Sequence, residues 1–426
     1  MTPVFDVAVV GAGPAGSSAA YHLASRGHRV LLLEKAAFPR DKACGDGLTA
    51  QSLQLLAQMG LSDKLASALK IAGLRVITER GERVLRCGPG DADRPGYAAV
   101  LPRIQLDHLV CQAAVDQGAT LWERSRVAGF LTRDERVAGV RVLCSDREVE
   151  VSARYVVLAD GGSSPLARQL GLGGVDRATS GYAVSGYFTG LTGIEPLFEI
   201  HAPATDPETG RPIAGYGWVF PTGAGSANIG VGYFQSQQGD QRLNLRQIAD
   251  HFVADLRARD SRFSQMRQTS SLRGGPLRCG LDPDRCTRPG VVLVGDAAGL
   301  VDPLTGEGID TALTSGALAA QLLGRLLEQS ENVDSQLAEY GQLLDERYHD
   351  RFQRGRDFIG IYMFLSAILE GSVDIAGVPG ELLEYASGAV GGGGGGRRPA
   401  TADLTDIQAI IRKAMAAVWA EVAKRM

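Results

Sequence analysis

Unbroken apolar runs and one helical pattern define the start of the chain. Residues 6–10 (DVAVV) and 29–34 (RVLLLE) predict buried parallel strands, since their apolar positions are consecutive rather than alternating. Between them, apolar positions at helical spacing predict a helix that Gly27 ends. Together these segments predict a β-α-β unit of about thirty residues.

The rest of the chain carries shorter patterns, which predict an antiparallel sheet and further helices. The strands of this sheet are expected at residues 182–191, 197–201, 215–220 and 227–234. Two more buried strands are expected at 148–159 and 291–294, and helices at 106–115, 307–328 and 335–370. The predicted fold class is therefore α/β combined with antiparallel β and a helical C-terminal region.

The glycine-rich turn after the first strand predicts a dinucleotide site. Residues 11–16 (GAGPAG) are a GxGxxG motif: Gly11 makes the tight turn, Gly13 lets a pyrophosphate approach the backbone, and Gly16 allows close helix packing. The phosphates would lie against free N–H groups at the start of the helix. Glu34 ends the next strand about twenty residues further on, where a carboxylate can hold ribose hydroxyls.

Two distant turns favour FAD over NAD as the bound dinucleotide. Residues 155–161 (YVVLADG) and 294–299 (VGDAAG) are strands that run into Asp/Gly turns, which suits an extended cofactor held at several points. These segments resemble a group of FAD enzymes that includes p-hydroxybenzoate-hydroxylase-type monooxygenases, flavin halogenases and geranylgeranyl reductases. The resemblance implies that Asp296 holds the ribityl chain, and that Asp160 and Gly161 close over the pyrophosphate.

The loop 302–309 (DPLTGEGI) precedes a long predicted helix. Its glycines would let a flavin ring approach the backbone, and the helix N-terminus would stabilise negative charge on the reduced ring. The resemblance also implies that Arg103 lies near the cofactor. The expected FAD-binding residues are Gly11, Gly13, Ala15, Gly16, Glu34, Lys35, Arg40, Cys44, Arg103, Val127, Asp160, Gly161, Gly295, Asp296, Pro303, Gly306, Gly308 and Ile309.

Two segments point to one branch of this group. Residues 38–48 (FPRDKACGDGL) resemble the cysteine-glycine segment of the geranylgeranyl reductase family, in a variant closest to its menaquinone-modifying branch. Residues 215–221 (GYGWVFP) match that family's YxWxFP motif. The resemblance covers roughly the first 330 residues. It implies an FAD-dependent reductase that saturates double bonds of a polyprenyl lipid of the geranylgeranyl or menaquinone type.

The resemblance makes Cys44, Gly45 and Asp46 the catalytic candidates. Cys44 could donate a proton, shape the pocket, or be a small buried hydrophobe, and Asp46 could orient a headgroup or a water. Tyr216, Trp218 and Phe220 alternate along one predicted strand and so share one face of its sheet. They are either an aromatic wall beside a prenyl chain or ordinary core residues.

Two other functions would use the same FAD-binding site. The first is an FAD-dependent monooxygenase or halogenase-like enzyme that oxidises an aromatic substrate or a protein-bound residue through C4a-hydroperoxyflavin. The second is a flavin-containing structural or redox-partner subunit without catalysis. Apart from the glycine run 391–396, no second GxGxxG occurs that could hold a nicotinamide nucleotide. NAD(P)H, ferredoxin or another donor is therefore expected to reach the flavin only transiently.

Composition and charge exclude some partners. A formal net charge of −4 and a pI near 5.9 argue against nucleic acid, because neutralising phosphates needs a basic surface. The six cysteines include no CxxC pair, so no metal site is expected and reduced thiols fit the cytoplasm. A strand expected from residue 5 onward leaves no room for a signal peptide.

The longest apolar run, residues 359–369, bears on membrane contact. It is about half the roughly 20 residues of a membrane-spanning helix and includes Gly360 and Ser366. It could line a lipid site or lie on a membrane surface. The expected location is therefore cytoplasmic, with the option of peripheral membrane contact.

The patterns and motifs together predict a discontinuous domain organisation. A Rossmann-type FAD-binding domain would combine residues 1–75, 100–180 and 270–330. A substrate-binding sheet domain would combine 76–99 and 181–269. The helical region 331–426 would contain a glycine-rich linker at 391–396 and a terminal helix at 403–424.

Overall fold

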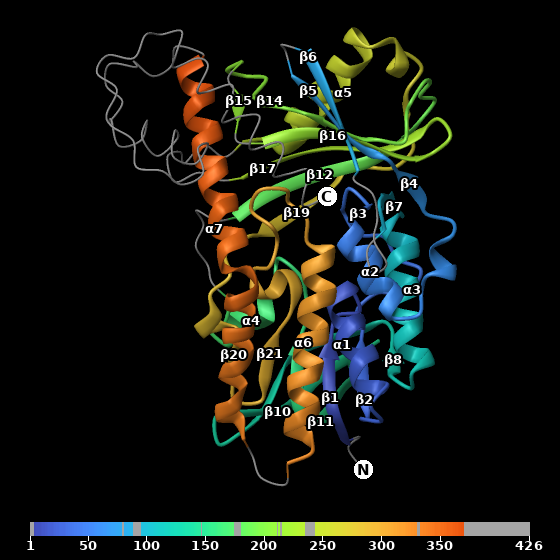
Figure 1. Ribbon diagram of the computed structural model, residues 1–426. Coiled ribbons are helices and arrows are strands. Elements are labelled where there is room, and N and C mark those ends of the chain that lie inside the picture. The colour runs from blue at the N-terminus through green and yellow to red at the C-terminus, as the bar shows by residue number, and fades with distance from the viewer. Residues whose placement is uncertain are drawn as a thin grey trace, which may run out of the picture.

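Two large sheets lie one above the other in the computed structural model (Figure 1). The structure describes residues 4–369 apart from 79–80, 88–94, 146, 174–179, 211, 214, 235–242 and 330–332. The expected linker at 391–396 and the terminal helix at 403–424 lie outside the described residues.

The first sheet is built around β1 (Val4–Val10), which pairs in parallel with β2 (Val30–Leu33) on one side and β11 (Arg147–Leu158) on the other. All four residues of β2 are buried, as its consecutive apolar residues predict. The strand order is β20-β21-β11-β1-β2-β8, with β10 and β9 added beside β11. The remaining strands are β8 (Thr120–Trp122), β9 (Ser125–Arg133), β10 (Arg136–Cys144), β20 (Thr287–Arg288) and β21 (Val291–Leu293).

Two helices pack closely over this sheet and against each other. They are α1 (Pro14–Ala24) and α6 (Ile309–Leu327), which come from opposite halves of the chain and lie side by side in Figure 1. Gly316 of α6 permits this contact, because a Cβ atom there would lie 2.3 Å from the carbonyl oxygen of Ala15. Both helices therefore present their N-terminal ends at the carboxyl edge of the first sheet.

The second sheet is mostly antiparallel, as predicted, and one of its faces is covered by α5 (Leu245–Arg259). Its strand order is β18-β12-β17-β16-β13-β5-β6, and β19 pairs with β12. Along β12, Val184 packs on the α5 side of the second sheet. Ala183 and Ser185 point to the opposite side, toward the loops at the carboxyl edge of the first sheet. The strands are β5 (Gly73–Thr78), β6 (Gly81–Arg86), β12 (Ser180–Thr189), β13 (Phe198–His201), β16 (Gly215–Gly223), β17 (Ser226–Phe234), β18 (Arg267–Gln268) and β19 (Arg273–Arg278).

A smaller layer connects the two sheets. A three-stranded sheet of β3 (Gly47–Leu48), β7 (Ala98–Val100) and β4 (Leu69–Ile71) shares a hydrophobic core with α2 (Ala50–Gln58) and α3 (Arg103–Asp116). Short elements complete the described chain: α4 (Pro165–Gln169) and the strand pair β14 (Ala204–Thr205) and β15 (Pro212–Ile213).

The helical C-terminal region begins with α7 (Ala338–Leu369), which runs along the molecule from the first sheet past the second (Figure 1). None of the helices in the described residues is long and apolar enough to cross a membrane. The expected fold class is confirmed. Three helix starts differ from the prediction: α3 begins at Arg103, α6 at Ile309 and α7 at Ala338. Pro102 and Gly308 occupy the N-cap positions of α3 and α6, and a 3-10 turn at Asp334–Leu337 precedes α7.

Two strands do not follow the predicted domain boundaries. β19 falls within the segment 270–330 expected for the FAD-binding domain, yet its hydrogen bonds join it to β12 of the second sheet. β5 begins at Gly73, inside the segment 1–75, yet pairs with β6 and β13 of the same sheet. The division of the chain into domains otherwise stays a prediction.

Candidate FAD and substrate site

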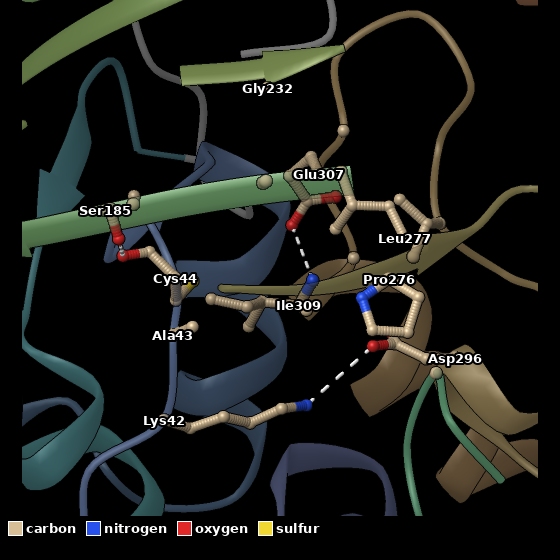
Figure 2. A pocket seen from close by; sticks show the side chains of 18 of the residues that line it. Lys42, Ala43, Cys44, Ser185, Gly232, Pro276, Leu277, Asp296, Glu307 and Ile309 are labelled. Atoms are coloured by element: carbon tan, nitrogen blue, oxygen red, sulfur yellow. Dashed lines mark hydrogen bonds and ion pairs between the residues drawn. The ribbon is translucent and has the colours of Figure 1, made fainter. Parts of the chain in front are cut away.

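A cavity of about 720 Å³ opens where the carboxyl edge of the first sheet meets one face of the second. Figure 2 shows Cys44 of the cysteine-glycine segment converging on it with Glu307 and Ile309 from the start of α6. Fifteen residues expected in the site line it: Gly13, Ala15, Lys35, Cys44, Gly45, Arg103, Asp160, Gly161, Tyr216, Trp218, Phe220, Asp296, Gly306, Gly308 and Ile309. The tertiary structure thus brings together motifs that lie far apart in the sequence.

The other expected residues do not line the cavity but lie beneath it or away from it. They are Gly11, Gly16, Glu34, Arg40, Asp46, Val127, Gly295 and Pro303. Val127 lies in β9 and packs against the core of the first sheet. Gly295 lies under the turn after β21, at φ +60°, with its N–H donated to Ser315 Oγ. Pro303 packs against Gly355 of α7, where an added Cβ would lie 3.0 Å from its ring.

The three glycines of the first turn meet different constraints. A Cβ atom on Gly11 would lie 2.4 Å from the carbonyl oxygen of Ala159, and one on Gly16 would lie 1.9 Å from that of Gly11. A Cβ atom on Gly13 would meet nothing closer than Arg40 Nη2, at 4.0 Å. The protein's own packing therefore requires the first and third glycines. The space above Gly13 is open, so the turn fits a dinucleotide pyrophosphate.

The carboxylate of Glu34 makes several of the contacts that fix this turn. Its Oε2 accepts from the N–H of Ala12 at 3.3 Å and pairs with Arg40 Nε at 3.2 Å, while its Oε1 accepts from Ala36 N–H at 3.0 Å. Arg40 also donates from Nη2 to the carbonyl oxygen of Ala12 at 3.2 Å. Glu34 directly follows β2, and these contacts tie its carboxylate to the glycine turn and to Arg40. Its expected role at the ribose stays a prediction.

Asp107 links this end of the site to Arg103 and was not identified from the sequence. Arg103 donates to it through two atoms, Nε at 2.6 Å and Nη2 at 2.9 Å, and Arg40 Nη1 pairs with it at 2.5 Å. Burial alone would raise the pKa of Asp107, but the two guanidiniums outweigh this effect and lower it. Its spacing of four residues from Arg103 would have been a signal only if the predicted helix had begun at Arg103, as α3 does, rather than at residue 106.

Asn228 holds the cysteine-glycine segment in place and was also missed. Its Nδ2 donates to the carbonyl oxygen of Cys44 at 2.7 Å and to Asp46 Oδ2 at 2.8 Å. Ser185 Oγ donates to the same carbonyl at 3.1 Å, and the N–H of Arg103 donates to Asp46 Oδ1 at 3.0 Å. The backbone around Cys44 is thus fixed from three elements.

Burial changes the acidity of both side chains in this segment. It raises the pKa of Asp46 to about 6, although hydrogen bonds from Tyr187 and Asn228 oppose the shift. Burial also raises the pKa of the Cys44 thiol, against the influence of Arg103. Asp46 itself is fully buried, so of the two only Cys44 reaches the cavity.

Tyr216, Trp218 and Phe220 project from one face of β16 into the cavity, as their alternation predicts. The indole of Trp218 lies over Gly230, where a Cβ atom would come within 2.3 Å of its ring. Phe220 packs against Phe198 with ring centroids 4.4 Å apart. These rings form an apolar wall of the cavity, opposite the loops at the carboxyl edge of the first sheet.

The wall continues across the sheet as a strip of small residues. Ala183 of β12 pairs with Gly232 of β17 on one side and with Gly275 of β19 on the other, and Gly232 pairs with Tyr216. All four residues line the cavity. Because three of them have little or no side chain, the strip is a groove bordered by aromatic rings.

The loop before α6 is anchored by Arg351 of α7, a third residue that sequence reasoning missed. Arg351 Nε pairs with Asp302 Oδ2 at 2.7 Å, and its Nη1 pairs with Asp310 Oδ2 at 2.8 Å. The hydroxyl of Tyr216 donates to the carbonyl oxygen of Thr305 in the same loop. Lys42 Nζ approaches Asp296 Oδ2 at 3.8 Å across the cavity (Figure 2).

Comparison with known proteins shows which proteins this chain resembles. The family model of the FAD binding domain matches residues 4–191. Menaquinone reductase of Mycobacterium tuberculosis is 38% identical over 319 residues, 75% of this chain and 76% of its own length. Digeranylgeranylglycerophospholipid reductase of Thermoplasma volcanium is 31% identical over 355 residues, 82% of this chain and 85% of its own.

Solved structures agree with the sequence relatives. A geranylgeranyl bacteriochlorophyll reductase-like protein of Thermoplasma acidophilum is 25% identical and covers 100% of both chains, with a TM-score of 0.75. The myxobacterial chondrochloren halogenase CndH is 25% identical over 82% of this chain and 81% of its own, with a TM-score of 0.68.

The fold, the glycine turn and the matched domain define an FAD-dependent oxidoreductase. Within that class, sequence identity above 30% across most of the relatives' length identifies the family. The chain belongs to the geranylgeranyl reductase family, as residues 38–48 and 215–221 led us to expect.

Proposed function

We propose that this protein saturates carbon–carbon double bonds of a polyprenyl lipid, with a menaquinone as the first substrate to test. The observation that carries the proposal is the apolar groove along Tyr216, Gly232, Ala183 and Gly275, which lies in the same cavity as the glycine turn. A prenyl chain is long and apolar and needs such a slot, with polar groups only at its mouth. The names of the relatives from Mycobacterium and Thermoplasma support the same substrate class.

The residues of the two halves of the cavity would have separate tasks. Gly13, Asp160 and Gly161 would hold the pyrophosphate region, Glu34 the ribose, and Asp296 the ribityl chain. The N-terminus of α6 would face the flavin ring, with Gly306 and Gly308 allowing close approach. Bound in this way, the reduced flavin supplies the hydride that an alkene must accept.

Substrate binding would rest on the second sheet. Trp218 and Phe220 would flank the chain, and the groove would exclude water from the double bond. An isolated alkene has no carbonyl to stabilise developing charge, so hydride addition must be accompanied by proton delivery. Asn228 and Ser185 hold the backbone of Cys44 at the cavity, so Cys44 would form part of the cavity wall beside the double bond.

The test is anaerobic. Photoreduced holoenzyme is mixed with menaquinone or a geranylgeranyl lipid in vesicles, and flavin reoxidation is followed by absorbance. Lipid that gains two hydrogens per reduced bond in the mass spectrum supports the proposal. NAD(P)H and reduced ferredoxin are then compared as electron donors, and activity with and without vesicles shows whether peripheral membrane contact is needed.

A flavin-dependent monooxygenase or halogenase is the second candidate, because the halogenase CndH shares the fold. The same preparation separates the two. Isotopically labelled oxygen, or halide in the presence of oxygen, would enter an aromatic product if the chain is oxidative. Reduced enzyme that leaves prenyl lipids unchanged but forms such a product would overturn the reductase proposal.

A further inference from the structure

We propose that Glu307 is the acid that delivers the proton to the double bond, with Asp310 and Arg351 as positioning residues. This inference rests on the proposed function and adds to it a group outside the cysteine-glycine segment. Glu307 lies in the loop directly before α6 and lines the cavity. Figure 2 shows its carboxyl group among the side chains that converge there.

The two carboxyl oxygens of Glu307 differ in their surroundings. Oε1 accepts from the N–H groups of Ile309 and Asp310, each at 2.9 Å, and so fixes the side chain across the start of α6. Oε2 is buried and accepts from no N–H or O–H donor among the described residues. A carboxyl group that is anchored through one oxygen can carry a transferable proton on the other.

The neighbouring charges favour a protonated Glu307 beside an ionised Asp310. Burial, the Asp310 carboxylate and a hydrogen bond between the two carboxyl groups raise the pKa of Glu307 well above its ordinary value, while Arg351, whose Nη2 is 3.9 Å from Oε2, opposes the shift. Burial would also raise the pKa of Asp310, but the hydrogen bond from Glu307 and Arg351 at 2.8 Å outweigh it and lower this pKa. Arg351 also pairs with Asp302, so its positive charge is shared between the carboxylates of Asp302 and Asp310.

The other groups that face Glu307 come from separate elements. Ser52 Oγ of α2 is 3.5 Å from Oε1 and supplies a neutral hydroxyl. On β16, the hydroxyl of Tyr216 is already donated to the carbonyl oxygen of Thr305. A Cβ atom on the adjacent Gly306 would lie 3.4 Å from that same hydroxyl. Glu307 is thus at the aromatic-wall side of the cavity, where the substrate is expected.

The alternative acids are less suited by position. Asp46 is fully buried, and its two oxygens accept from Arg103 and Asn228. The Cys44 thiol has a raised pKa and is therefore a weak acid beside a carboxyl group. Asp160 also has an unpartnered buried oxygen, but it lies at the end of β11 beside the glycine turn.

The O–H bond of Glu307 would break as its proton bonds to one alkene carbon, while reduced flavin, when bound, would supply the hydride and its electron pair for the other carbon. The product would gain two hydrogens, the flavin would be left oxidised, and Glu307 would be left as a carboxylate. A proton from solvent would then return to Glu307 before the next turnover.

The decisive variant is Glu307→Gln, because a glutamine carbonyl can still accept from Ile309 and Asp310 but the side chain has no acidic proton. Glu328→Gln is the matched control, since Glu328 is exposed at the other end of α6. We expect Glu307→Gln to keep its FAD and its rate of flavin reduction but to lose about 10²- to 10⁴-fold in kcat for lipid reduction. Glu307→Asp should recover part of this loss.

Infrared spectroscopy of the holoenzyme gives a readout that does not depend on turnover. We expect a protonated-carboxyl C=O band at neutral pH in the wild type and in Glu328→Gln, and its absence in Glu307→Gln. An unchanged kcat in Glu307→Gln, a missing band in the wild type, or parallel loss of FAD and activity would each overturn the inference. A wild type that reduces no prenyl lipid but shows the band would instead overturn the proposed function.

Discussion

The indole Nε1 of Trp218 donates a hydrogen bond to Oδ1 of Asn228 at 3.0 Å. The amide nitrogen of the same asparagine donates to the Cys44 carbonyl and to Asp46. Asn228 therefore joins the aromatic wall of the second sheet to the cysteine-glycine segment of the first domain. It is buried and all of its bonds are made within the protein.

Replacing Asn228 with Leu should destabilise the protein and misplace Cys44. The change removes three buried hydrogen bonds and leaves the Trp218 indole N–H without its partner, whereas the Cys44 carbonyl and Asp46 each keep another donor. An unpartnered buried group costs about 1–3 kcal/mol, and each of the other lost hydrogen bonds about 1 kcal/mol. We expect a decrease of at least about 2 kcal/mol in the free energy of unfolding, measured in urea, together with reduced turnover. Asn244→Ala is the comparison, since Asn244 only caps α5 and its loss costs about 1 kcal/mol. Equal effects of the two changes would contradict the assigned role.

Asp46 should make stability depend on pH. Its pKa is raised by burial from 3.8 to about 6, so between these values the folded protein holds a proton that the unfolded chain has lost. The free energy of unfolding should therefore fall as the pH rises through this window, by about 1.4 kcal/mol per pH unit and about 3 kcal/mol in all, and level off above it.

The measurement is urea unfolding across that window in the wild type and in Asp46→Asn. Asparagine suits the site because residue 46 has φ +65°, a conformation that asparagine tolerates. The variant carries no titrating group at this position and should lose this part of the pH dependence. Identical pH profiles in the two proteins would show that Asp46 is ionised throughout.

Gly13→Ala should separate cofactor binding from folding. An added methyl group at Gly13 meets no protein atom closer than 4.0 Å, so the fold should be unaffected, but it occupies the space expected for the pyrophosphate. We expect a folded protein that retains little FAD, measured by flavin absorbance per protein. Gly16→Ala, whose Cβ would lie 1.9 Å from the carbonyl oxygen of Gly11, should instead disturb the fold itself. Full FAD content in Gly13→Ala would place the pyrophosphate elsewhere.

Ala183→Phe should obstruct the proposed prenyl groove. The new ring would project over the strip of small residues formed with Gly232 and Gly275. We expect KM for a long polyprenyl lipid to rise at least about tenfold, while FAD content and flavin reduction stay unchanged; filling an apolar pocket with one large group has effects of this order. Val184→Ile, one residue along but on the α5 face, is the control. An unchanged KM would mean that the chain binds along another surface.

Local segments were predicted well because short-range patterns determine them. The GxGxxG turn, the strand that ends at Glu34, and the shared face of Tyr216, Trp218 and Phe220 all follow from the backbone periods of strands and helices. The motif at residues 38–48 likewise indicates the family, because its residues are contiguous in the chain.

Residues that act through distant partners could not be predicted in this way. Asn228 meets Asp46 across 182 positions of the chain, and Arg351 reaches Asp302 across 49. Neither residue belongs to a motif, and an isolated asparagine or arginine is ordinary in a strand or helix. The same holds for β19, whose sequence does not show that its partner is β12 rather than a strand of the first sheet.

The amino-acid sequence by itself determined the class of cofactor, the family and the strands and helices that carry the motifs, because these depend on the spacing of residues within short segments. Other elements, such as α5 (Leu245–Arg259), were not predicted. Tertiary structure decided which side chains meet at the cavity: the Glu34–Arg40–Asp107–Arg103 chain of charges, the anchor at Asn228, and the pairing of Glu307 with Asp310 beside Arg351. These contacts depend on how two sheets and a C-terminal helix pack, and burial at that junction is what alters the acidity of the groups there.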